Sequence, residues 1–97
     1  MNNKRLSQRI AGLRIKSRIT ASLEKEGHLI SPQRRVLIDA LCEAREITNV
    51  EDFWLQLRKQ HHISWSTVYS NINLLVRKGW LIREGSGVRN YTYHVVV

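Results

Sequence analysis

The sequence contains one cysteine, Cys42, among its 97 residues. A single thiol excludes an intramolecular disulfide and any zinc site built from cysteines. It fits a reducing compartment, and we expect a cytoplasmic protein. No apolar run approaches the ~20 residues that a membrane-spanning helix needs. Basic residues also interrupt the N-terminal segment, where a secretion signal would have a continuous apolar core.

Catalytic motifs are missing as well. The sequence has no glycine-rich phosphate loop, no paired carboxylates suited to acid–base chemistry and no activated nucleophile. His61 and His62 are adjacent, and adjacent residues rarely converge on one metal ion, so they are expected in a solvated turn. We therefore expect no enzyme, no metal site and no cofactor.

Positive charge is abundant and unevenly distributed. The chain has 16 Lys and Arg against eight Asp and Glu. Residues 1–23 hold no acidic residue, and their basic residues are Lys4, Arg5, Arg9, Arg14, Lys16 and Arg18. This pattern predicts a basic N-terminal helical arm over residues 1–26 beside a nearly balanced domain over residues 27–97. Nucleic acid is the leading partner, with an anionic membrane surface, an acidic protein or mere solubility as alternatives.

The arm is expected to be helical over residues 4–26. Apolar residues at helical spacing form two offset stripes, Leu6, Ile10 and Leu13, then Ile15, Ile19 and Leu23. Gly12 lies between the stripes and suggests a kink or break. Gly27 stands where a helix C-cap would be.

Three further helices have recognisable starts. Ser31-Pro32 provides an N-cap and a proline suited to the first helical position. Thr48 and Asn49 offer the next cap, ahead of two carboxylates that complement the helix dipole. Ser64 caps the last helix, which should stop at Gly79. Cys42 lies beside the apolar stripe of the first of these helices and is expected to be a small filler without chemistry.

The last helix, residues 65–78, has two distinct sides. Its core side is expected to hold Trp65, Val68, Ile72, Leu75 and Val76. Its outward side holds Ser66, Ser70, Asn73 and Arg77, with Thr67 and Tyr69 on the flanks, and no carboxylate. After Gly79 the pattern changes to two β-branched and aromatic strands around a Gly-Ser-Gly turn, which predicts a β-hairpin over residues 80–97.

Three short capped helices followed by a hairpin are the element order of a winged helix-turn-helix. We therefore expect a mainly α fold with a β-hairpin, preceded by the basic N-terminal helix. Trp54, Trp65 and Trp80 are expected to fill much of its small core.

Such a fold predicts sequence-specific binding of double-stranded DNA, with helix 65–78 in the major groove. Short Ser66 and Ser70 allow close approach, while Asn73 suits adenine and Arg77 suits guanine or a phosphate. Tyr69 suits a thymine methyl or a phosphate. Arg83 and Arg89 on the hairpin would act from a wing on the neighbouring minor groove or its phosphates.

Three stretches resemble a known family: "SPQRRVLIDAL", "NVEDFWLQL" and "ISWSTVYSNINLLVRKGWLIRE". In this order they are similar to the DNA-binding half of the ferric uptake regulator (Fur) family, across residues 27–95. The resemblance implies that Thr67-Val68-Tyr69 lies on the recognition helix, that Tyr69 touches a base and that Arg34 contacts a phosphate. Ser70 stands where the family usually has an arginine, so its customary operator is not expected.

The dimerisation half of that family, with its histidine-rich and CxxC metal sites, has no counterpart in the sequence, so metal sensing is not carried over. The chain is then a stand-alone DNA-binding domain or a fragment, and its initial Met and basic arm favour the former. The first expectation for the N-terminal segment is contact with DNA phosphates through Lys4, Arg5, Arg9 and Arg14. A homodimer through the Leu6, Ile10 and Leu13 stripe is the second expectation.

Other functions stay open. A winged helix can be a protein–protein interaction module, and an exposed Trp65 or Trp80 would favour that reading. A non-specific nucleic-acid binder, or an RNA-binding module without an evident stacking platform, is the remaining alternative.

Overall fold

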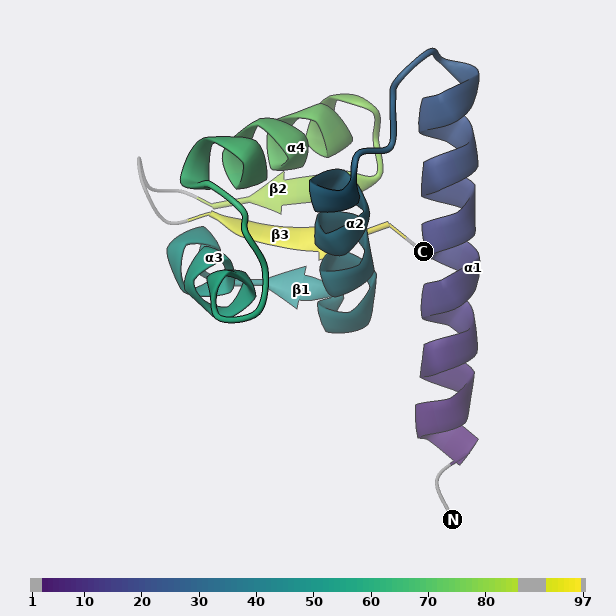
Figure 1. The fold of residues 1–97 in the computed structure, drawn as a ribbon. Coiled ribbons are helices and arrows are strands. Elements are labelled where there is room, and N and C mark those ends of the chain that lie inside the picture. Colours follow the sequence, from purple (N-terminus) through teal and green to yellow (C-terminus); the bar gives the residue numbers. More distant parts are fainter. Residues whose placement is uncertain (1–2, 86–90, 97) are drawn as a thin grey trace.

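The computed structural model describes residues 3–85 and 91–96, with side chains from Ile10 onward. Four helices and three strands follow one another in this part of the chain (Figure 1). Their bounds are α1 Asn3–Lys25, α2 Pro32–Ala44, β1 Glu46–Ile47, α3 Val50–Arg58, α4 Trp65–Arg77, β2 Leu81–Glu84 and β3 Thr92–Val95. The mainly helical winged-helix architecture predicted from the sequence is confirmed.

Side-chain caps begin α2, α3 and α4 as predicted. The Ser31 hydroxyl accepts from the Arg34 amide at 3.1 Å, and the Ser64 hydroxyl accepts from the Thr67 amide at 3.1 Å. Asn49 caps α3 by accepting from the Asp52 amide at 3.0 Å. Each cap satisfies an amide of the first turn that no intrahelical carbonyl reaches.

A glycine follows the C-terminal end of α1 and of α4, also as predicted. Gly27 has φ 89° and Gly79 has φ 83°, a left-handed conformation that disfavours any side chain. Past each glycine the next amide turns back to the helix: His28 donates to the Leu23 carbonyl at 2.9 Å and Trp80 to the Leu75 carbonyl at 2.9 Å. These bonds satisfy carbonyls that the helix leaves unpaired.

A three-stranded antiparallel sheet, in the order β1-β3-β2, closes one side of the molecule. The hairpin strands β2 and β3 pair from Leu81 opposite Val95 to Glu84 opposite Thr92. The short β1 was not predicted; it pairs with the other edge of β3, with Ile47 opposite Tyr93. The sheet thereby ties the end of α2 to the base of the wing.

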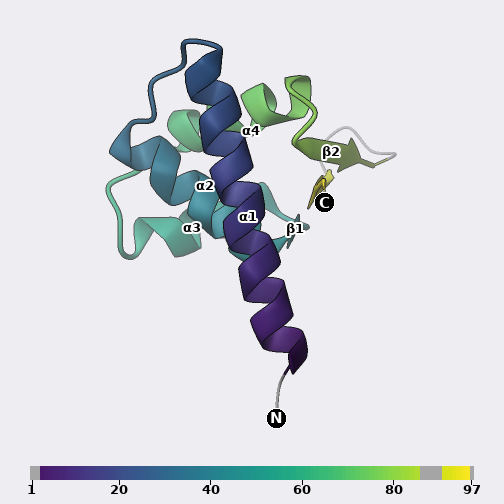
Figure 2. The same ribbon diagram turned by 90° about the vertical axis from the view of Figure 1, so that its right-hand side faces the viewer.

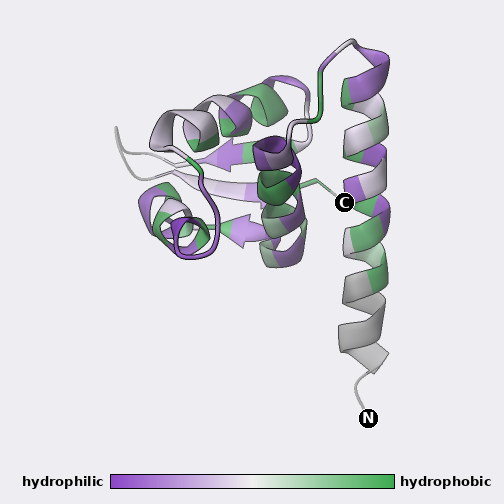
Figure 3. Cartoon of the chain, in the orientation of Figure 1, coloured by the Kyte–Doolittle hydropathy of each residue, from purple (hydrophilic) through white to green (hydrophobic). Residues whose placement is uncertain are grey.

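The second half of α1 contributes to the core. Ile15, Ile19 and Leu23 are 6%, 2% and 1% exposed and belong to the same buried cluster as the side chains of α2, α4 and the sheet. The coloured part of α1, like α2 and α4, carries both hydrophobic and hydrophilic residues, as helices packed on a core do (Figure 3). The division into an arm, residues 1–26, and a domain, residues 27–97, stays a prediction. The stripe of Ile15, Ile19 and Leu23, however, belongs to the hydrophobic core of the domain.

Gly12 does not break α1, which runs as one helix from Asn3 to Lys25, so the suggested kink is wrong. A Cβ at Gly12 would lie 3.3 Å from the carbonyl oxygen of Cys42 on α2. The glycine therefore lets the two helices approach closely. Cys42 is buried as expected of a filler, and burial, with the Asp39 carboxylate second, raises the pKa of its thiol to about 11.

Among the described side chains, ion pairs join α1 and the turn that follows it to the rest of the domain. Lys16 pairs with Asp39 on α2. Lys78, just after α4, pairs with Glu26, just after α1, and its hydrogen bond lowers the pKa of the Glu26 carboxyl. Both pairs are partly solvated, so they orient α1 more than they stabilise it.

The three tryptophans do not share one environment. Trp54 and Trp80 are partly buried against the core, in line with the prediction. Trp65 is 39% exposed, so its assignment to the core was wrong. The buried side of α4 is centred on Val68 and Leu75 and includes the unpredicted Asn71, which leaves Trp65 at its margin in the first turn.

Candidate nucleic-acid interface

The outward side of α4 is where the sequence placed it. Ser66, Tyr69, Ser70 and Arg77 are exposed, and Thr67 and Asn73 are partly exposed. The opposite side is anchored by Val68 and Ile72, which are both fully buried. The core thus holds α4 so that all six predicted contact residues face or border solvent.

Hydroxyl groups cluster at the start of α4. The Ser64 hydroxyl lies 2.8 Å from the Thr67 hydroxyl and 3.2 Å from that of Ser66. The Ser70 hydroxyl donates to the Thr67 carbonyl at 3.2 Å. Thr67 is therefore part of the cap, while Ser66 and Ser70 are short exposed groups that can approach a ligand closely.

Asn71 is a polar residue on the buried side of α4, 6% exposed. Its amide nitrogen donates to the Thr67 carbonyl at 2.8 Å, and its oxygen accepts from Arg34 Nε at 2.6 Å. Arg34 also donates through Nη1 to the Leu29 carbonyl at 2.7 Å. The guanidinium therefore fixes the first turn of α2 to α4. The phosphate role implied for Arg34 stays a prediction beside this structural one.

Replacing Asn71 with Ala is expected to lower the free energy of unfolding by about 1–3 kcal/mol, because Arg34 Nε loses its acceptor in a half-buried site. The matched control is Asn73→Ala, the same change on the same helix at a partly exposed position, expected within about 0.5 kcal/mol of the parent. Urea unfolding of both variants measures the difference. Equal destabilisation by the two would show that the Arg34–Asn71 contact does not hold α4.

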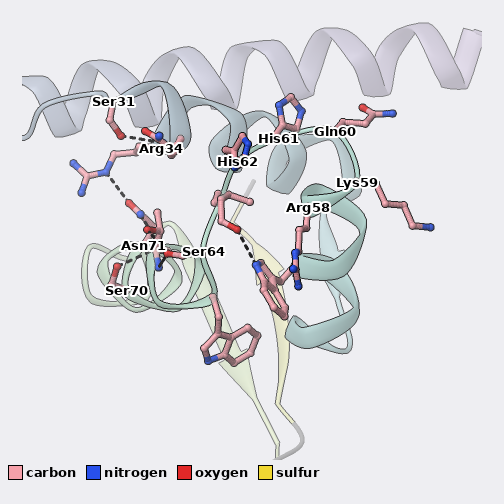
Figure 4. Close-up of a pocket in the computed structure, with 15 residues that line it drawn as sticks. Ser31, Arg34, Arg58, Lys59, Gln60, His61, His62, Ser64, Ser70 and Asn71 are labelled. Atoms are coloured by element: carbon pink, nitrogen blue, oxygen red, sulfur yellow. Dashed lines mark hydrogen bonds between the residues drawn. The ribbon is translucent and has the colours of Figure 1, made fainter.

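A groove of about 1110 Å³ lies between the start of α2, the end of α3, the following loop and the start of α4. Its positive and ionisable lining residues are Arg34, Arg58, Lys59, His61 and His62. No carboxylate is among the described residues that line it. In Figure 4, Arg34, Ser70 and Asn71 lie on one side of the groove, and Arg58 and Lys59 on the other.

The groove also receives the N-terminal ends of two helices, because the caps Ser31 and Ser64 line it. Helix N-termini carry partial positive charge, and amides there favour anions. Together with the guanidinium and ammonium groups, this makes the groove chemically suited to a phosphate backbone. His61 and His62 were predicted in a solvated turn, but Arg58 and Lys59 were not predicted to belong to a site. The available signal was a basic run, residues 58–62, that contains no acidic residue.

The two histidines are exposed, as expected of a turn. Within the described residues, no three His, Cys, Asp or Glu side chains lie close enough together to hold a metal ion. Nor does any helix in that part of the chain combine the length and apolar character that a membrane crossing requires.

The lining of the groove includes Trp54 and Trp65, and aromatic rings cover the first turn of α4 there. The Trp65 and Tyr69 ring centres are 5.5 Å apart, and Trp54 meets Trp65 edge to face at 5.7 Å. Trp54 Nε1 donates to the Ile63 carbonyl at 2.9 Å, and the Arg58 guanidinium lies 5.1 Å from its ring centre. Trp54 and Tyr69 therefore pack against the Trp65 ring, and the remaining surface of the ring is exposed to solvent.

The wing carries one described candidate. Arg83 on β2 is exposed, and its guanidinium lies 4.8 Å from the ring centre of Tyr91. Arg89 and the Gly-Ser-Gly turn from Ser86 lie outside the described residues. Tyr93, on β3, packs in the core, and burial raises the pKa of its phenol.

The first half of α1 extends past the body of the domain, at the end away from α4 (Figure 2). Ile10 and Leu13 are 43% and 62% exposed there, and Arg14 is exposed. The side chains of Lys4, Arg5 and Arg9 lie outside the described ones. The structure brings Arg34 and the α4 residues together, but it does not bring Arg14 to them.

Comparison with protein-family models matches residues 25–95 to the ferric uptake regulator family. None of the curated proteins matches the chain. The matched residues include α2, α3, α4 and the hairpin strands, the elements that form the groove and the outward side of α4. The chain belongs to the ferric uptake regulator family, whose members are DNA-binding transcriptional regulators rather than enzymes.

Proposed function

We propose that this protein is a transcriptional regulator that reads double-stranded DNA sequence-specifically, with α4 in the major groove. One observation carries the proposal: the outward side of α4, which has no carboxylate, borders a groove lined by Arg34, Arg58 and Lys59. An α-helix fits the major groove, and phosphates beside it demand positive charge. The β2–β3 hairpin would then serve as a wing, with Arg83 on the adjacent minor groove or its phosphates.

Base contacts are assigned to Ser66, Tyr69, Ser70, Asn73 and Arg77, and phosphate contacts to the basic lining residues Arg34, Arg58 and Lys59. Because α1 begins at the far end of the molecule, Arg14 and the basic residues before it would reach a different part of a bent duplex, or none. Pairing of two copies through Ile10 and Leu13 is the alternative use of that helix, and both residues are exposed.

A protein–protein interaction module is the second candidate, and the exposure of Trp65 is the observation that favours it. The surroundings of Trp65 favour DNA instead, because its neighbours in the lining of the groove are basic or uncharged. A partner protein would have to be strongly acidic to match them.

The test is a selection from random duplexes, followed by anisotropy titration of the recovered sequence at two salt concentrations. Tyr69→Ala and Asn73→Ala are each expected to weaken binding to that sequence by about 1–3 kcal/mol while leaving non-specific binding nearly unchanged. The expectation rests on direct base contacts by these two side chains. Gln56→Ala, at an exposed position on α3 outside the groove, is the control.

Salt-sensitive binding without a recovered motif would replace this proposal with non-specific binding. No binding to any duplex would favour the protein-interaction candidate. An inverted repeat in the recovered sequence would add that two copies bind together, since symmetric half-sites mirror a symmetric protein pair.

A further inference from the structure

We propose that Trp65 determines specificity by contacting the 5-methyl group of a thymine at one position of the recognised DNA. The inference rests on the proposed function and deepens it, since it names a feature of the preferred sequence and the residue that reads it. Trp65 is the first residue of α4, directly after the Ser64 cap, and is 39% exposed. Its exposed ring surface adjoins the outward side of the helix.

The ring is held in place before any ligand binds. Trp54 packs edge to face against it at 5.7 Å, and Trp54 is itself fixed by its hydrogen bond to the Ile63 carbonyl. Tyr69, one helical turn further on, covers another side at 5.5 Å. A side chain fixed in this way loses little conformational freedom on binding, which favours a role in recognition.

The neighbours of Trp65 limit what can cover it. Ser66 and Ser70 are short, exposed neighbours on the same helix, and the basic side chains of the groove favour an anionic ligand. The phosphates of a DNA duplex supply the negative charge. Most of the atoms that the duplex exposes in its major groove are polar donors or acceptors. The thymine 5-methyl is the apolar group that a base pair offers there, so it is the one that an indole ring can desolvate favourably.

Tyr69 is a separate candidate for the same kind of contact. It lies on the flank of α4 and is equally exposed, at 39%. Since the two rings touch, they form one aromatic surface that would meet adjacent base pairs. A test must therefore assign each thymine to one ring.

The experiment uses the full chain and the duplex selected above. Each thymine is replaced in turn by uracil, which pairs identically but lacks the methyl group, and affinity is measured by anisotropy for the parent and for Trp65→Gln. Burying one methyl group corresponds to about a fourfold gain in affinity. We expect uracil at one position to weaken the parent about fourfold and to have no effect on Trp65→Gln.

Two further variants make the result specific. Trp65→Phe keeps an apolar ring and is expected to keep the uracil penalty at that position. If Trp65→Gln fails to fold, Trp65→Ala, which also lacks a ring, takes its place and is expected to lose the penalty. Leu55→Gln removes a similarly exposed apolar residue, 42% exposed, on α3 outside the groove, and should leave every uracil effect unchanged.

The proposal is overturned if every uracil effect is the same in Trp65→Gln as in the parent, or if no thymine can be replaced with loss. A methyl read only by Tyr69 would give the first of these outcomes. If no motif is recovered from the selection, the proposed function fails together with this inference. A motif that depends on Tyr69 but shows no coupling to Trp65 overturns this inference alone.

Discussion

A chain that lacks residues 1–23 is expected to be largely unfolded, because it loses Ile15, Ile19 and Leu23 from the core. Burial of a large apolar side chain contributes about 1.5–3 kcal/mol. Three such residues therefore contribute about 5–9 kcal/mol, which is comparable to the whole stability of a small domain, about 5–15 kcal/mol. The deletion also removes Lys16, the partner of Asp39.

The matched control is a shorter deletion of residues 1–9, which ends before the core stripe. It removes Lys4, Arg5 and Arg9 but no described core residue, and is expected to keep a cooperative thermal transition near that of the full chain. Circular dichroism during heating compares the two deletions. A cooperative transition at an unchanged temperature after loss of residues 1–23 would contradict the prediction and would show that residues 24–97 fold independently.

The shorter deletion also tests the basic arm without disturbing the fold. If all three basic residues contact phosphates, the slope of log affinity against log salt should fall by up to about 0.9 for each. An unchanged slope would place this end of α1 away from the duplex, as the direction of α1 in Figures 1 and 2 suggests.

Local chemistry made much of the fold predictable. The caps Ser31, Asn49 and Ser64 and the left-handed glycines Gly27 and Gly79 act within one helical turn, so sequence alone was sufficient to place them. The hairpin was equally predictable from its β-branched and aromatic residues on either side of a Gly-Ser-Gly turn. By contrast, β1 has two residues, too few for any alternation. It follows Arg45, whose φ of 67° has no sequence signal because arginine rarely adopts it.

The site was only partly predictable, because its missing members depend on tertiary packing. The periodicity of apolar residues assigned Trp65 to the core. Trp65 is in the first turn of α4, however, and a residue there can lie beyond the core that the rest of the helix packs against. Asn71 was overlooked because its burial depends on Arg34, which is 37 residues away along the chain and meets it only in the fold. The basic groove has the same origin, since Arg34 and Arg58 come from different helices.

The substitution expected to have the largest effect on DNA binding is Ser70→Glu. Ser70 is exposed on the outward side of α4 and lines the groove, and its hydroxyl bonds only within its own helix among the described contacts. Placing a like charge against phosphates costs several kcal/mol. We therefore expect affinity for every duplex to fall by about 100-fold or more. Because glutamate suits an exposed helix position, the free energy of unfolding should change by less than about 0.5 kcal/mol.

Two controls separate charge at the interface from charge in general. Ser70→Gln has the size of the glutamate without its charge and should lose much less affinity. Gln56→Glu changes the net charge equally on the exposed side of α3, outside the groove, and should cost little, because water and salt screen a charge that does not contact the phosphates. If Ser70→Glu were no more damaging than Gln56→Glu, α4 would not lie against the phosphates. The aromatic surface of Trp65 and Tyr69 would then be better explained by a protein partner.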